Sequence, residues 1–159
     1  AQNCERASAR SPRRSDEVLL LDETSAHPVM SDREMIAMLV EYMAKGFLEN
    51  IIALFKQEPD LMRHIAVLIA DEQVVVRLGA TALVEELVKS HRSELRAAVP
   101  GLVALLAHAS PTIRGDAVNL LGIIGDPLSR AAIGGLMRDE NAAVRMLAGE
   151  ALREIDQGE

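Results

Sequence analysis

The chain has 159 residues and a net charge of −7, and 49% of its residues are hydrophobic whereas only 2% are aromatic. A chain of this length buries roughly 70% of its unfolded surface, so it can form a core without a structural metal, and its single cysteine, Cys4, excludes an internal disulfide framework. No apolar run approaches the ~20 residues of a membrane-spanning helix, and no segment has the net positive charge that nucleic-acid backbones attract. We therefore expect a soluble, cytoplasmic protein with an aliphatic core that binds neither membranes nor nucleic acids.

Residues 1–30 differ in composition from the rest of the chain. They are rich in serine, arginine and acidic residues and show no sustained apolar period, which is typical of a flexible tail. The stretch "DEVLLLDE" at residues 16–23 is alternatively a short docking peptide. The remainder, residues 31–159, is predicted to form a single domain.

Residues 31–58 predict a pair of helices that caps the N-terminal end of the domain. Ser31 and Glu34 have the spacing of a capping box, and Gly46 can end the first helix in the left-handed conformation. Large flexible and aromatic side chains are concentrated here, and they suit either the end of the core or the interface of a weak dimer. These side chains are Met35, Met38, Tyr42, Met43, Phe47 and Phe55.

Three later segments align on a Val-Arg or Ile-Arg dipeptide. Their arginines are Arg77, Arg114 and Arg145, separated by 37 and then 31 positions. Apolar residues recur one position before each arginine and three, six, seven and ten positions after it, and at about 100° per residue these positions share one helix face. A second apolar run precedes each dipeptide. Each copy is therefore predicted to be a helix A, a tight turn and a helix B, at residues 60–90, 95–125 and 129–156.

The residues at the predicted turns agree with this division. Ser110 followed by Pro111 is a typical helix start, and Asn141 is a good N-cap for the third B helix. Gly125 is suited to ending the second B helix.

This pattern resembles HEAT repeats, and "LLGIIGD" at the end of the second B helix is similar to the short HEAT-like repeats of phycobilin lyases. The resemblance covers about residues 60–156 and implies an all-α, right-handed superhelix of about eight helices. It also implies a ladder in which turn aspartates bond to B-helix arginines of neighbouring repeats. The implied ladder residues are Asp71, Arg77, Arg114, Asp139 and Arg145. His108 replaces the aspartate in the second copy, so that rung is weaker or differently paired, or His108 is a solvent-facing turn residue.

The position of the arginines favours the same structural role on physical grounds. Each lies about 75° from the centre of the apolar face, where a long side chain can cover apolar surface and carry its charge to a neighbouring turn. A ligand-binding row of arginines is the alternative. Arg114-Gly115-Asp116 also spells an adhesion tripeptide, but the repeat places it within a helix, whereas adhesion requires an exposed loop tip.

No constellation of catalytic, cofactor-binding or metal-binding residues is found. The histidines are His27, His64, His91 and His108, and no two of them have the spacing of a zinc site. We expect no cofactor, and we predict a non-catalytic scaffold or regulatory adaptor that binds a partner protein along the B helices, as a monomer or as a weak dimer through the N-terminal helix pair. The alternative is an accessory subunit of a lyase-type enzyme acting on a protein-bound chromophore or prosthetic group.

The predicted groove consists of the B-helix positions opposite the core. They are Leu78, Ala82, Glu85, Gly115, Asn119, Gly122, Met146, Glu150 and Arg153.

Overall fold

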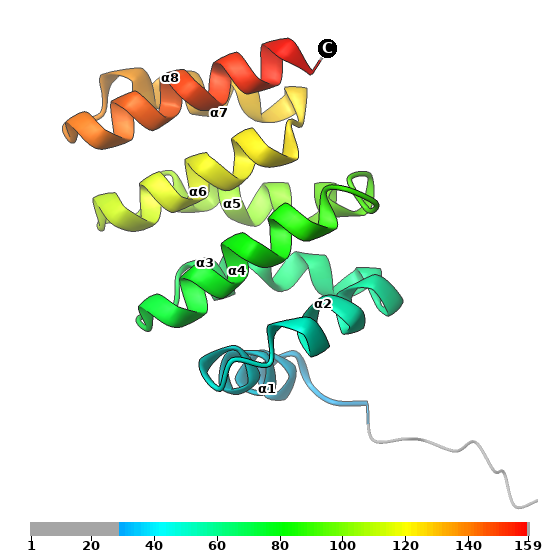
Figure 1. Ribbon diagram of the computed structural model, residues 1–159. Coiled ribbons are helices and arrows are strands. Elements are labelled where there is room, and N and C mark those ends of the chain that lie inside the picture. The colour runs from blue at the N-terminus through cyan, green and yellow to red at the C-terminus, as the bar shows by residue number, and fades with distance from the viewer. Residues whose placement is uncertain (1–28, 159) are drawn as a thin grey trace, which may run out of the picture.

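The computed structural model describes residues 29–158, in which eight α-helices form a stack of helical pairs and no strand occurs (Figure 1). The predicted tail lies outside the described residues except for its last two positions, and so do Cys4, His27 and the predicted docking peptide at residues 16–23. The helices are α1 (Asp32–Ala44), α2 (Leu48–Gln57), α3 (Ile65–Ile69), α4 (Val74–Leu87), α5 (Val99–Leu105), α6 (Pro111–Ile124), α7 (Arg130–Gly135) and α8 (Ala142–Gln157).

The helices α4, α6 and α8 are the B helices, and Figure 1 shows them stacked along one side of the molecule. The A helices α3, α5 and α7 are short, and each is preceded by a 3₁₀ turn. These turns are η1 (Pro59–His64), η2 (Glu94–Ala98) and η3 (Pro127–Ser129), and a fourth, η4 (Leu136–Arg138), follows α7. Two of the turns begin with a proline, which lacks an N–H and is accepted at the first helical position. The sequence predicted an A helix in each copy but not this division.

The B helices bury the face that the repeat predicts. Ala80, Ala117 and Ala148 stand three positions after the repeat arginines and are completely buried. The small alanine side chains let neighbouring helices approach closely, and larger residues at the other core positions fill the space between the two layers. Apart from Phe55 the core is aliphatic, and it is continuous from α1 to α8. Two expected core positions of the B helices, Ile113 and Leu152, are only half-buried.

Helix ends follow the local signals with one difference. Ser31 and Glu34 form a complete capping box, and the Asn141 side chain accepts hydrogen bonds from two backbone N–H groups. Gly46 and Gly125 have φ angles of 83° and 67°, a region that favours glycine because it has no Cβ. Ser110 precedes α6, but its side chain makes no capping bond.

The N-terminal pair closes one end of the core. Met43 and Phe55 are buried within it, whereas Tyr42 and Phe47 are exposed with their ring centroids 5.6 Å apart. The weak dimer through this pair stays a prediction. Within residues 29–158 no helix has the length and apolar character needed to cross a bilayer.

Candidate functional site

The three repeat arginines share a contact that the sequence did not predict. Each donates hydrogen bonds from Nη1 to the backbone carbonyls six and five positions before it, in the turn that precedes its own helix. The two distances are 2.9 and 3.1 Å for Arg77, 2.9 and 3.1 Å for Arg114, and 2.6 and 3.1 Å for Arg145. Each arginine therefore connects its B helix to the turn that precedes that helix. This contact is independent of any contact with a neighbouring repeat.

Arg114 also joins the second repeat to the third. Its Nε and Nη2 atoms donate to the two carboxylate oxygens of Asp139, each at 2.9 Å. The Arg114 and Asp139 side chains are only 8% and 6% exposed. Hydrogen bonds from Arg114, and then from the backbone N–H of Asn141, hold the pKa of Asp139 below its usual value. This bidentate pair is the geometry in which a guanidinium binds a carboxylate most strongly.

The turn residues Asp71, His108 and Asp139 occupy equivalent places. The side chain of each accepts a hydrogen bond from the backbone N–H two residues later, at 2.8, 3.0 and 2.8 Å. In His108 the acceptor is Nδ1, so the imidazole reproduces the turn contact of an aspartate without its negative charge. Asp71 meets no ladder arginine, because α2 in the preceding pair contains none.

Arg77 consequently pairs with a different acid. Its Nε lies 3.4 Å from Oδ2 of Asp116, on α6, rather than against the turn at His108. Asp116 is half-buried, and its burial raises its pKa more than the neighbouring Arg77 lowers it. The first junction thus has a looser ion pair than the second.

Two clefts lie on either side of Asp116. One, of about 220 Å³, lies between α4 and α6 and is lined by Val74, Arg77, Leu78, Thr81, Thr112 and Asp116. The other, of about 240 Å³, lies between α6 and α8 and is lined by Pro111, Thr112, Gly115, Asp116, Asn141, Ala143, Val144 and Leu147. Thr112 and Asp116 therefore form the ridge between two neighbouring clefts.

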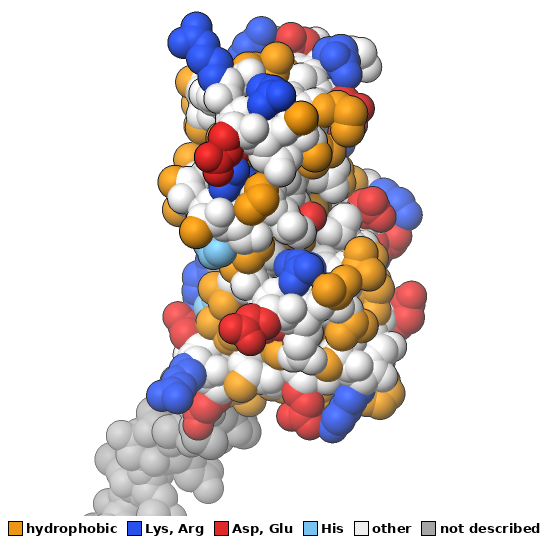
Figure 2. Space-filling view, turned by 90° about the vertical axis from the view of Figure 1, so that its left-hand side faces the viewer, with side chains coloured by type: hydrophobic (Ala, Val, Ile, Leu, Met, Phe, Trp, Pro, Cys, Tyr) orange, Lys and Arg blue, Asp and Glu red, His pale blue; other side chains and the backbone are white. Residues whose placement is uncertain are grey.

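Seven of the nine residues of the predicted groove are exposed or half-buried, and the two glycines are buried. Leu78 and Met146 are 66% and 60% exposed. Other members that are exposed or half-buried are Ala82, Glu85, Asn119, Glu150 and Arg153. Figure 2 views the stack from the edge where the B helices begin, and hydrophobic side chains gather along its right-hand side in a lower and an upper group, with a paler region between.

Gly115 and Gly122 do not form one continuous open floor, because both are buried against α8. Gly115 borders the cleft between α6 and α8, and Gly122 borders a different cavity. A Cβ on Gly115 would stand 3.0 Å from Cδ1 of Leu147, and one on Gly122 would stand 2.9 Å from Cβ of Ala151. Gly122 is needed for close contact between α6 and α8, because a Cβ there would meet the backbone of Ala151, whereas at Gly115 only the end of a side chain is in the way. The groove is therefore replaced by two separate clefts toward the N-terminal ends of the B helices.

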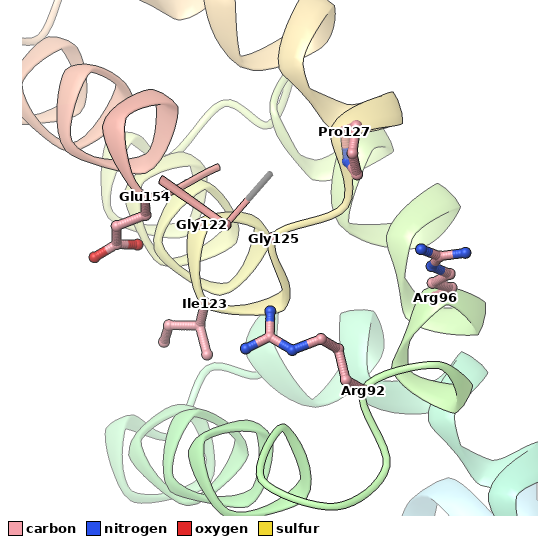
Figure 3. A pocket seen from close by; sticks show the side chains of 8 residues that line it. Arg92, Arg96, Gly122, Ile123, Gly125, Pro127 and Glu154 are labelled. Carbon is pink, nitrogen blue, oxygen red and sulfur yellow. The ribbon is translucent and has the colours of Figure 1, made fainter. Parts of the chain in front are cut away.

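A larger cavity, of about 730 Å³, lies at the other end of the B helices (Figure 3). Arg92 donates to the carbonyl of Ile124 at 2.8 Å, and Figure 3 shows its guanidinium pointing toward Gly125. Arg96 and Glu154 lie on opposite sides of that turn in the same view. Charges of both signs line this cavity without converging on one point, so its geometry selects no single class of ligand.

The histidines do not assemble a metal site in the part of the chain that the structure describes, where no three histidine, cysteine or acidic residues converge. His64 is buried, and its Nε2 lies 3.6 Å from Oδ1 of Asp32. Burial lowers the pKa of His64, and Asp32 also binds Arg63 at 2.7 Å.

Replacing His108 with aspartate is expected to raise the melting temperature by about 2–3 °C. The new carboxylate would keep the turn hydrogen bond and give Arg77 the kind of partner that Asp139 gives Arg114. The gain should be larger in an Asp116→Asn background, where no second acid competes for Arg77. Thermal unfolding by circular dichroism measures both changes, with His108→Asn as the neutral control. An aspartate variant no more stable than the asparagine variant contradicts the expectation.

Residues 99–159 match the family model described as HEAT repeats. The matched segment starts at α5 and includes α6, which carries Arg114, and the turn before α8, which carries Asp139. A comparison with curated protein sequences finds no match.

Proposed function

Because residues 99–159 match the HEAT-repeat family, we propose that this chain is a non-catalytic scaffold or regulatory adaptor that binds a partner protein on its B helices. HEAT repeats generally mediate interactions between proteins. The proposed contact area, called the B-helix surface below, comprises the two clefts beside Asp116 together with Leu78 and Met146.

The exposure of Leu78 and Met146 is the observation that supports this proposal. Both are large apolar side chains on B helices, and each leaves most of its area in water. Val74, which is 58% exposed, lines the same cleft as Leu78. Single exposed apolar residues are ordinary, but a group beside preformed clefts is typical of a binding surface.

The B-helix surface offers a partner more than apolar area. Arg77 lines the cleft between α4 and α6, and its hydrogen bonds to the preceding turn hold its side chain in place. Held side chains lose little conformational entropy on binding, so they favour a specific complex. Such a surface is suited to a peptide or helix lying across several repeats.

The test compares two double variants with the same change in charge. Leu78→Glu with Met146→Glu alters the B-helix surface, whereas Val67→Glu with Leu128→Glu alters exposed apolar residues on α3 and η3. Partners are captured from host lysate, identified by mass spectrometry, purified, and measured by titration calorimetry. We expect the first variant to weaken binding at least about tenfold and the second to leave it unchanged, since burying a charge in an apolar contact costs more than that factor.

Each outcome has a definite meaning. A partner that binds both variants as tightly as the parent chain contradicts the placement of the surface. A pigment that co-purifies with the chain and its partner favours the accessory subunit of a lyase-type enzyme instead.

A further inference from the structure

Asp116 differs from Asp139 in how well its charge is stabilised. Asp139 receives two hydrogen bonds of 2.9 Å from Arg114, whereas the nearest contact of Asp116 with Arg77 is 3.4 Å. Arg77 cannot simply turn toward Asp116, because its Nη1 is held by two turn carbonyls. The carboxylate of Asp116 is therefore partly desolvated, and Arg77 only partly compensates for the lost hydration. Its pKa is raised for this reason.

Apolar side chains line the clefts on both sides of Asp116, and Arg77 also lines the cleft on the α4 side. Val74 and Leu78 contribute to the cleft on the α4 side, and Val144 and Leu147 contribute to the cleft on the α8 side. The shared ridge adds the hydroxyl of Thr112 and is open to solvent, since Thr112 is exposed. A side chain that approaches along this ridge meets a carboxylate flanked by two apolar depressions.

We propose that the B-helix surface recognises a partner segment with an arginine or lysine that pairs with Asp116 and with apolar side chains on either side that enter the two clefts. The inference rests on the proposed function and specifies the chemistry of the partner. A cation in this place would provide the compensation that Arg77 gives only in part, and the aliphatic stem of arginine or lysine suits the apolar walls. The net charge of −7 also favours encounter with a basic segment.

Asp116 is thus a specificity determinant rather than a source of stability. Because burial raises its pKa, the folded chain does not depend on its negative charge, and Asp116→Asn should retain the parent melting temperature. This separates loss of recognition from loss of folding. The same substitution at Asp139 would not allow that separation, since Arg114 would lose a buried partner.

The experiment uses an array of synthetic twelve-residue peptides with one central arginine, serine at most other positions, and two leucines placed at every spacing around the arginine. A matched array carries citrulline, which has nearly the same shape as arginine but no charge. The purified chain is tested by fluorescence anisotropy against the best peptides. We expect the arginine peptides to bind at least about fivefold more tightly than their citrulline forms, because a partly desolvated charge pair contributes to binding. Asp116→Asn should abolish that preference.

The results separate this inference from the proposed function. Equal binding of arginine and citrulline peptides, an unchanged preference in Asp116→Asn, or an array without any binding peptide overturns the pairing with Asp116. If the Leu78→Glu, Met146→Glu variant then still loses its protein partner, the B-helix surface stands without this specificity. If that variant keeps its partner, the proposed function fails as well.

Discussion

Arg114→Ala is expected to lower the melting temperature by about 10 °C or more, because it leaves the Asp139 carboxylate buried without its cation. The substitution removes two hydrogen bonds to Asp139 and two to the turn before α6. Arg145→Ala is the matched control, since Arg145 is exposed and its hydrogen bonds go only to its own turn. That variant should lose only about 2–3 °C.

Two further measurements identify the cause of the loss. Arg114→Lys keeps the positive charge but not the planar fork, so it should lie between the parent and the alanine variant. Equal losses in Arg114→Ala and Arg145→Ala would show that the bond between repeats adds nothing to the capping of the turn.

The same ion pair makes stability depend on pH. The pKa of Asp139 is lower in the folded chain than its ordinary value, so its stabilisation is present above the ordinary value and is lost as the pH falls through the folded value. The acid-side decrease in melting temperature, measured between about pH 5 and pH 2, should therefore be shallower in Arg114→Ala than in the parent chain.

Gly122→Ala is expected to reduce the free energy of unfolding by about 1–2 kcal/mol, although alanine is the better helix former by about 1 kcal/mol. A Cβ at this position would stand 3.0 Å from Cα of Ala151, and a backbone atom cannot move without shifting α8. The carboxylate of Glu154 is also close, at 2.6 Å, but it can rotate away.

Gly115→Ala is the control for this prediction. Its new methyl group would meet only the end of the Leu147 side chain, at 3.0 Å, and that side chain can adjust. We therefore expect a change between zero and a gain of about 1 kcal/mol. Denaturant unfolding of both variants measures the difference, and effects of the same sign would contradict the distinction between backbone and side-chain contacts.

The repeat architecture could be predicted from sequence because its cause is local. Apolar residues at fixed offsets from Arg77, Arg114 and Arg145 must share a helix face, whatever the rest of the chain does. The match of residues 99–159 to HEAT repeats agrees with the predicted resemblance over that segment, and the helical solenoid of residues 29–158 confirms the fold class.

The candidate site was harder to predict because its contacts join separate repeats. Glycine on a helix is consistent with an open surface and with close helix packing, and only the position of α8 shows that Gly115 and Gly122 serve packing. The pairing of Arg77 with Asp116 could not be derived from the ladder pattern. The histidine at position 108 shows that Arg77 lacks an aspartate in the next turn, but it does not show which acid Arg77 contacts instead.

The unequal ion pairs also have a mechanical consequence. In a stack of helical pairs each pair contacts only its neighbours, so the stiffness of each junction depends on how strongly the two adjacent pairs are joined. The junction between α6 and α8 is fastened by a bidentate pair and by glycine-mediated close contact, whereas the junction between α4 and α6 has one longer ion pair. We therefore expect the solenoid to flex mainly between α4 and α6, so that the cleft beside Leu78 changes width while the cleft beside Leu147 keeps its shape.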